Sequence, residues 1–349
     1  MNQDKTENYN FCDDIFTITS NTEKIRKFRY GNPVSAKRLE VVSGKETQFE
    51  VSYRLEKGEI DIDKSFPLTE LYGIKGIRNA SEVFQQRAFP FGGNALLVLR
   101  NLYSNRPEVI VNTKYETWSS LRVTQVEPAG RLLTHIVTLK LLQEGFLPIH
   151  SAAVKIHGKT ILIVAPPNTG KTYTAMKLVD LGGKFISEDL GIVAGSDFYG
   201  LPYTETVEKR NPDNPLFFKL KQKIHGVFFK TNFRKGDVFS TNTIKLNEAL
   251  SKGKIDTIFI LRKGKKTLES LSENRTVKLL ESINSIEFGY SSDKMIRFYL
   301  FLNGPRHIRD CMNIEKELIR NLASRHPAYL VSGEKVEDYN NLILKKLGS

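Results

Sequence analysis

The sequence predicts an α/β (α+β) protein with a β-rich N-terminal domain, residues 1–127, and a larger α/β domain, residues 128–349. In the first part of the chain, strand-like segments are broken by Gly, Pro and Asn. Further on, an aliphatic run leads through a glycine-containing loop into a segment with helical spacing, over residues 161–180. A chain of 349 residues with 40% hydrophobic content is enough for one large core or two moderate ones, and we expect two domains.

The N-terminal domain is expected to contain strands at residues 14–19, 38–42, 47–55, 94–99 and 108–111. It shows no catalytic constellation, so we expect it to bind or present a substrate or to pair subunits. Residues 130–144 carry apolar side chains at helical spacing and predict an amphipathic helix at the start of the second domain. The boundary is therefore placed near Pro128.

The segment after this helix has the pattern of a phosphate-binding loop. Residues 161–164 are four consecutive aliphatic residues, as in a strand buried on both faces. Gly170 permits a turn that directs successive amide groups toward an anion at a helix N-terminus. Lys171 supplies a positive charge for the outer phosphates, and the hydroxyl of Thr172 can face a magnesium ion that bridges them. The predicted nucleotide-binding residues are Ala165, Pro166, Pro167, Asn168, Thr169, Gly170, Lys171 and Thr172.

Ala165 stands where the P-loop consensus usually has its first glycine, which leaves the turn less free but still allowed. The preceding strand and the following helix are the context that the motif requires. The alternative is an ordinary strand-to-helix turn whose Lys171 points to solvent.

A pair of adjacent acids, Glu188 and Asp189, follows one helix later, at the end of a predicted short strand. The ends of neighbouring strands meet in a parallel sheet, so we expect these acids beside the phosphate loop. Near a magnesium nucleotide, one acid would hold the metal and the other would take a proton from an attacking hydroxyl. The alternative is a solvated pair at a strand end.

Three segments in order carry a resemblance to a known family: residues 148–154, Pro-Ile-His-Ser-Ala-Ala-Val; the loop 165–172; and residues 186–189, Ile-Ser-Glu-Asp. Together they resemble the HPr kinase/phosphorylase superfamily. This resemblance implies a PEP-carboxykinase-like fold with a P-loop for the second domain, with ATP and Mg²⁺ as cofactors. The glycine-rich substrate loop and the C-terminal signature of the true HPr kinases do not occur here, so the chain resembles a divergent relative.

The resemblance also implies roles for individual residues. Lys171 would bind the β and γ phosphates, and Thr172 and Asp189 would hold magnesium. Glu188 occupies the position of the family's proton-accepting aspartate, and its extra methylene moves the base by about a bond length. His150 matches a position beside the transferred phosphate, although a lone histidine before an apolar strand is more often structural.

Divergent relatives phosphorylate a serine near the end of a lasso-peptide precursor, and others act on small hydroxyl compounds. The resemblance therefore implies an ATP-dependent kinase that transfers the γ-phosphate to a serine hydroxyl of a peptide or protein. A kinase of free serine or of a sugar is one alternative. A non-catalytic nucleotide sensor is another, and it is favoured by Glu188 standing in place of aspartate.

Two arginines are predicted as further phosphate or substrate contacts. A buried strand at residues 255–261 delivers Arg262 to its end, and a basic turn at residues 304–309 carries Arg306. Surface positions are equally consistent with both. Residues 217–223 and 227–230 mix aromatic residues with lysines, which fits either contact with an acidic peptide or amphipathic elements with solvated lysines. Residues 314–322 are expected to be helical.

The formal charge of +13 favours acidic ligands such as nucleotide phosphates. No zinc, helix-turn-helix or aromatic RNA signature accompanies this charge, so nucleic acid is not expected as a partner. The polar start and the lack of a long apolar run predict no secretory signal and no membrane span. With only Cys12 and Cys311, which give at most one disulfide, a cytoplasmic location is expected. Oligomers are common in the family, so a homo-oligomer is among the expected states.

Overall fold

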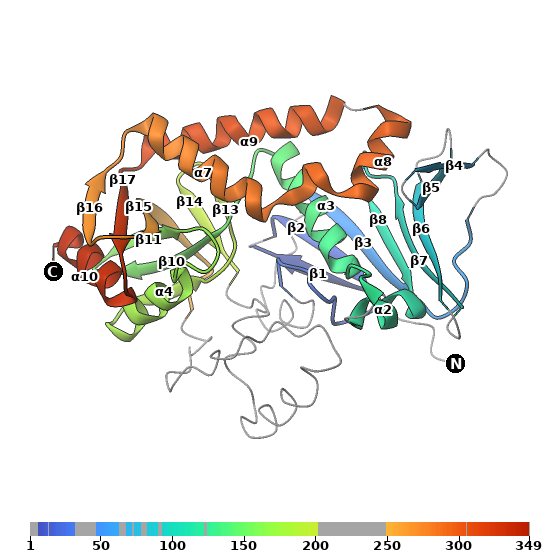
Figure 1. Cartoon of the computed structure of the whole chain (residues 1–349), viewed down its shortest axis with the longest axis horizontal. Helices are drawn as coiled ribbons and strands as arrows, with labels where there is room; N and C mark the ends of the chain where they lie inside the picture. Colours follow the sequence, from blue (N-terminus) through green and yellow to red (C-terminus); the bar gives the residue numbers. More distant parts are fainter. Residues whose placement is uncertain are drawn as a thin grey trace, which may run out of the picture. The chain divides into compact units, whose positions relative to one another are not determined.

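The computed structural model describes residues 6–12, 14–31, 47–62, 68–71, 73–77, 82–89, 93–121, 124–201, 249–304 and 306–348 (Figure 1). They form two compact units. The first holds the described residues up to Lys140 and the segment Tyr290–Ile308; the second holds those of Leu141–Val207, Asn242–Gly289 and Arg309–Ser349. The segments 38–42, 217–223 and 227–230 singled out above lie outside the described residues. The domain boundary predicted between residues 127 and 128 stays a prediction.

The first unit contains a mixed sheet of eight strands in the order β1-β2-β3-β8-β7-β6-β5-β4. Strand β3 pairs in parallel with β2 and β8, and the other neighbours are antiparallel. The strands are β1 (Glu7–Phe11), β2 (Phe16–Ser20), β3 (Phe49–Glu56), β4 (Leu68–Leu71), β5 (Ile74–Ile77), β6 (Glu82–Phe89), β7 (Gly93–Arg100) and β8 (Glu108–Asn112). The helices are α2 (Thr113–Ser120), α8 (Lys294–Asn303) and α3 (Ala129–Gln143), the last belonging to this unit up to Lys140.

Aromatic side chains build the core at one end of this sheet. The ring of Phe16 stacks on Phe11 at 5.1 Å and on Phe49 at 5.6 Å between ring centroids. Along β3, Phe49, Val51 and Tyr53 are buried, whereas the residues between them are partly exposed. This period of two is typical of a strand with one covered face. The strand predicted at residues 47–55 is therefore present as β3.

The second unit contains a nine-stranded mixed sheet. Strands β12, β10, β11, β15, β17 and β16 lie side by side in this order, while β14, β13 and β9 continue from the start of β15. Their bounds are β9 (Leu147–Ile149), β10 (Ser151–Ile156), β11 (Lys159–Val164), β12 (Lys184–Ser187), β13 (Gly191–Ala194), β14 (Asp197–Gly200), β15 (Lys252–Lys263), β16 (Thr267–Ser270) and β17 (Ala328–Gly333). The helices are α4 (Lys171–Asp180), α7 (Glu273–Glu287), α9 (Arg306–Arg325, in this unit from Arg309) and α10 (Val336–Leu347). The 3-10 turn η3 (Gly289–Ser292) follows α7 and belongs to the first unit from Tyr290 on.

Helices α4 and α10 pack together on β10, β11, β15 and β17 (Figure 1). Buried apolar side chains from all six elements form one cluster there, with Ala175 and Leu178 from α4 and Tyr339 and Ile343 from α10. Each fully buried aliphatic side chain in such a layer stabilises the fold by about 1.5–3 kcal/mol. This cluster fixes the position of α4, and with it the loop that leads into α4.

The structure differs from the sequence prediction in the arrangement of the second sheet. The acids were expected at the end of a strand in a parallel sheet, but β10 lies between β11 and β12 and is antiparallel to both. Only the β11–β15 and β15–β17 pairs of this sheet are parallel. The prediction was wrong here because a short buried strand has the same apolar composition whichever way it runs.

The predicted helices form at shifted bounds. The helix expected at 130–144 is α3, the segment expected to be helical at 314–322 lies inside the longer α9, and the helix after the phosphate loop begins at Lys171. Within the part of the chain that the structure describes, no helix has both the length and the apolar character needed to cross a lipid bilayer.

Candidate active site

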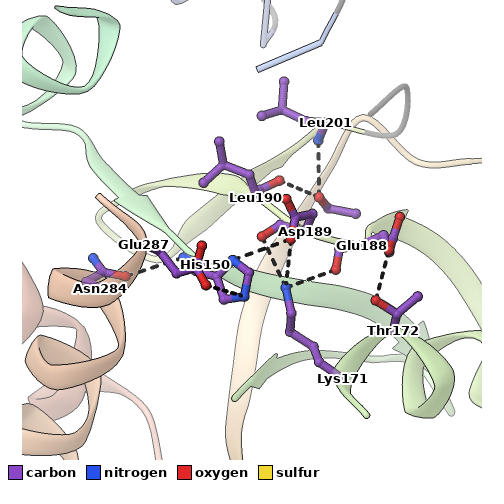
Figure 2. Close-up of polar contacts among 10 residues, drawn as sticks. His150, Lys171, Thr172, Glu188, Asp189, Leu190, Leu201, Asn284 and Glu287 are labelled. Carbon is purple, nitrogen blue, oxygen red and sulfur yellow. Dashed lines mark hydrogen bonds and ion pairs between the residues drawn. The ribbon is translucent and has the colours of Figure 1, made fainter. Parts of the chain in front are cut away.

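The segments that carry the main predicted site residues meet at one edge of the second sheet. Because β10 is antiparallel to both β11 and β12, these two strands run in the same direction and end at this edge. Strand β10 begins there, with Ser151 opposite Val164. The loop after β11, the acids after β12 and His150 before β10 are therefore brought together (Figure 2).

The loop between β11 and α4 has the backbone that the phosphate-binding motif predicts. Gly170 has φ of +109° and occupies the N-cap position of α4. Asn168 also has a positive φ, +64°. Such left-handed residues turn the chain sharply and direct amide groups toward the space before a helix, where an anion is stabilised. Ala165 is buried, and the side chains at positions 166–168 are exposed.

Lys171 lies beneath this loop and faces the acids instead of the solvent. Its side chain is only 7% exposed, and Nζ donates hydrogen bonds to the main-chain oxygens of Glu188 and Asp189, both at 3.1 Å. The same Nζ lies 3.6 Å from Oδ1 of Asp189. The alternative with a solvated Lys171 is therefore wrong. The positive charge is held between the loop and the paired acids.

The two acids lie in different surroundings. Glu188 is 2% exposed, and its Oε1 accepts a hydrogen bond of 2.8 Å from Oγ1 of Thr172. The Asp189 side chain is 31% exposed, and its Oδ1 lies 3.4 Å from Nδ1 of His150. Ser187 stabilises the turn that carries both acids, since its hydroxyl donates to the Leu190 carbonyl and accepts from the amide of Leu201. The acids thus face two different sides of one site.

The magnesium and phosphate roles that the resemblance implied for these residues stay predictions. For magnesium, the resemblance paired Thr172 with Asp189, whereas in the structure the hydroxyl of Thr172 bonds to Glu188. His150 was implied to lie beside the transferred phosphate, and in the structure its ring nitrogens face the carboxylates of Asp189 and Glu287. Figure 2 shows this row of side chains, with Lys171 on the other side of Asp189.

Helix α7 supplies two residues that the sequence analysis missed. Oε1 of Glu287 lies 3.7 Å from Nε2 of His150. The side-chain amide of Asn284, 1% exposed, accepts from the backbone N–H of His150 at 3.3 Å and donates to the Pro148 carbonyl at 2.9 Å. Their spacing of three residues places them on one face of the helix. No sequence motif links this face to a histidine more than a hundred residues earlier in the chain.

The two arginines are not placed alike. Arg262 lies near the carboxyl end of β15, two residues beyond the partner of Val164, and is at the same sheet edge as the loop. Its Nε donates to Oγ of Ser332 at 3.3 Å. Arg306 begins α9 in the first unit, and its side chain lies outside the described residues. A phosphate or substrate contact by either arginine remains a prediction.

The donor atoms of the site fit a magnesium ion shared with bound phosphates better than a metal ion whose ligands all come from the protein. Among the described residues, no three or more His, Cys, Asp or Glu side chains converge as they would around such a metal. Magnesium, however, is usually bound by one or two carboxylates together with water and substrate phosphates. The hydroxyl of Thr172 and the carboxylate of Glu188, 2.8 Å apart beside the phosphate loop, fit that donor set.

Fold and site together define a mixed α/β protein in which a strand–loop–helix segment lies beside two adjacent acids. No protein-family model and no curated protein matches the chain. Among solved structures, the chain is similar to the Hpr(Ser) kinase/phosphatase from Coxiella burnetii, with 11% identity and a TM-score of 0.22, over 36% of this chain and 76% of that chain. The chemistry proposed below therefore rests on the geometry of the site, and the choice of acceptor rests on the sequence resemblance.

Proposed function

We propose that this protein is an ATP-dependent phosphotransferase that moves the γ-phosphate of ATP to a serine hydroxyl of a peptide or protein. One observation carries this proposal: Lys171 and Thr172, consecutive at the start of α4, each bond to the segment of the paired acids. A nucleotide in the loop would have its outer phosphates beside two carboxylates. Transfer to a hydroxyl requires this combination of bound phosphate, cation and acceptor-side base.

The chain's own residues would hold the nucleotide in three ways. Backbone amides of the loop and the N-terminus of α4 would bind phosphate oxygens, and Gly170 allows the turn that aims them. Lys171 would place its charge on the β and γ phosphates, where it acts strongly because it is buried. Magnesium, when bound, supplies further positive charge to the phosphates, with Thr172 and a carboxylate as its candidate protein ligands.

The contacts of the two acids favour one division of labour. Glu188 bonds to Thr172, so we assign Glu188 to the metal side of the site. Asp189 is more exposed and contacts His150 and Lys171, so we assign it to the acceptor side, where it would take the proton of the attacking hydroxyl. The assignment implied by the resemblance, with Asp189 on the metal and Glu188 as the base, is the alternative.

Substitution of each acid by its amide separates these assignments. Glu188→Gln is expected to raise the magnesium concentration needed for half-maximal ATP binding about tenfold, because a metal ligand loses its charge. Asp189→Asn is expected to leave that concentration within about twofold and to slow transfer about 10²- to 10⁴-fold, because the proton acceptor is lost. A fluorescent ATP analogue titrated against magnesium measures the first effect and labelled phosphate transfer the second. The opposite pattern would support the alternative assignment.

The acceptor is the part of the proposal that depends on the resemblance. The resemblance favours as acceptor a serine near the end of a peptide, as in a lasso-peptide precursor, so the partner would be a peptide or protein. It also favours a PEP-carboxykinase-like fold for the catalytic domain. Free serine or a sugar would meet the same chemical requirement, a hydroxyl that can approach Asp189. The contacts of the site fit an alcohol acceptor in either case.

The direct test is transfer of the labelled γ-phosphate of ATP by the full chain with magnesium. Serine-containing peptides, free serine and a sugar are offered separately, and label is expected in the peptide. Label in free serine or the sugar alone would instead identify a small-molecule kinase. Tight ATP binding without transfer to any acceptor, including those of a whole-cell extract, would identify a nucleotide sensor and overturn the proposal.

A further inference from the structure

We infer that Glu287 is a positioning residue of this site, which holds the imidazole ring of His150 against the carboxylate of Asp189. Glu287 is the last residue of α7, and nothing in the sequence patterns connects it with the phosphate loop or the acids. This role rests on the proposed function, because Asp189 is the acid assigned to the acceptor side. It adds to the site a residue that acts through another side chain and does not touch the nucleotide.

The imidazole of His150 lies between two carboxylates. Its Nδ1 is 3.4 Å from Oδ1 of Asp189, and its Nε2 is 3.7 Å from Oε1 of Glu287. The side chains of His150 and Glu287 are 6% and 15% exposed, so water screens their contact only weakly. Because the two nitrogens lie on different sides of the ring, contacts at both of them define how the ring is turned.

The backbone that carries His150 is held by the same helix. Asn284 accepts from the N–H of His150 and donates to the carbonyl of Pro148, which ties both polar groups on one side of this segment to α7. The amide of Asn284 also donates to Oε1 of Glu315 at 3.2 Å. With the backbone fixed, rotation of the side chain is the remaining freedom of His150. Glu287 and Asp189 are placed to set that rotation.

The orientation of His150 matters because of what lies on the far side of Asp189. Oδ1 of Asp189 faces both Nδ1 of His150 and Nζ of Lys171, at 3.4 and 3.6 Å. The carboxylate is thus held from two directions, by the ring and by the lysine. If the ring turned away, the carboxylate would be free to follow Lys171 alone. A displacement of about 1 Å in such a group can slow a reaction about 10²-fold.

The competing explanation is that Glu287 and His150 form a contact that only stabilises the fold. A double-mutant cycle with Glu287→Gln and His150→Ala separates the two, since Gln keeps the shape of Glu and removes its charge. In the native background, we expect Glu287→Gln to lower kcat about 10- to 100-fold and to leave the KM for ATP unchanged. In the His150→Ala background, the same change should lower kcat less than about twofold, because no ring remains to be held.

Glu281→Gln is the matched control. Glu281 lies on the same helix six residues before Glu287 and on a different side of the helix. Its substitution by Gln is the same chemical change as Glu287→Gln. It is expected to leave kcat unchanged. Equal losses from Glu287→Gln with and without His150 would show that Glu287 does not act through the ring, and would overturn the inference.

A second measurement does not depend on catalysis. The side-chain ¹⁵N resonances of His150, assigned by their loss in His150→Ala, should shift in Glu287→Gln and not in Glu281→Gln, in the protein without nucleotide. Unchanged resonances would overturn the positioning role. If the native protein transfers no phosphate, the proposed function fails. A shift of these resonances in Glu287→Gln would still show that Glu287 orients the ring of His150.

Discussion

Replacing Lys171 with methionine is expected to slow phosphate transfer about 10³-fold, because removal of a single charge-stabilising donor from an active site has an effect of this order. Methionine has nearly the length of lysine and fits a buried position without the charge. In the native protein, Nζ of Lys171 is buried and bonded to the carbonyls of Glu188 and Asp189. The substitution therefore removes the cation for the outer phosphates and also leaves both carbonyls without this donor.

The affinity for ATP is expected to fall as well, since the positive charge beneath the loop is lost. Single-turnover transfer of labelled phosphate and titration with a fluorescent ATP analogue measure the two effects. Lys177→Met is the matched control, because Lys177 lies on the same helix and is exposed. It is expected to change both quantities less than about twofold, as surface substitutions usually do. Transfer by Lys171→Met at a rate near that of the control would remove Lys171 from the mechanism.

Replacing Gly200 with alanine is expected to lower the free energy of unfolding by about 3 kcal/mol, at the upper end of the usual cost of overpacking. A Cβ atom at this position would lie 2.4 Å from the carbonyl oxygen of Ile186 and 2.7 Å from its Cγ2. The backbone of Gly200 cannot move away easily, because its N–H donates to the Ser251 carbonyl at 2.7 Å. Ile186 precedes Glu188 by two residues, so the strain reaches the turn that carries the acids.

Urea unfolding of the full chain measures this loss. Gly58→Ala is the control, because no heavy atom lies within 4 Å of the corresponding Cβ position and the glycine has no positive φ. It is expected to change stability by less than about 0.5 kcal/mol, with alanine also reducing the freedom of the unfolded chain. Equal midpoints for the two variants would show that β14 can shift relative to β12 without cost.

The strand, turn and helix that form the proposed phosphate loop were predictable because the information lies within one short stretch of chain. An aliphatic run, a glycine and a lysine–threonine pair specify a strand, a turn and a helix in order, and β11, the positive φ of Gly170 and α4 have these positions. The acids at the end of β12 were also found, because their distance from the loop along the chain suits one intervening helix. Their roles could not be divided from sequence, since adjacent carboxylates have the same composition whichever way each one turns.

The contribution of α7 could not be predicted for a different reason. Asn284 and Glu287 look like ordinary polar residues of an amphipathic helix, and they contact His150 only after the chain has folded back on itself. The position of β10 is of the same kind. Its direction depends on pairing with β11 and β12, which no local pattern records.

The sequence by itself determined that a strand, a turn with Gly170 and a helix would present Lys171 and Thr172, and that two acids would follow at a strand end. These features depend on backbone preferences and apolar periodicity over a few residues. Only the tertiary structure decided that Thr172 bonds to Glu188, that His150 contacts Asp189 and that Glu287 lies on the far side of that ring. Such contacts depend on strand order and helix packing, which arise from burial of apolar surface across the whole unit.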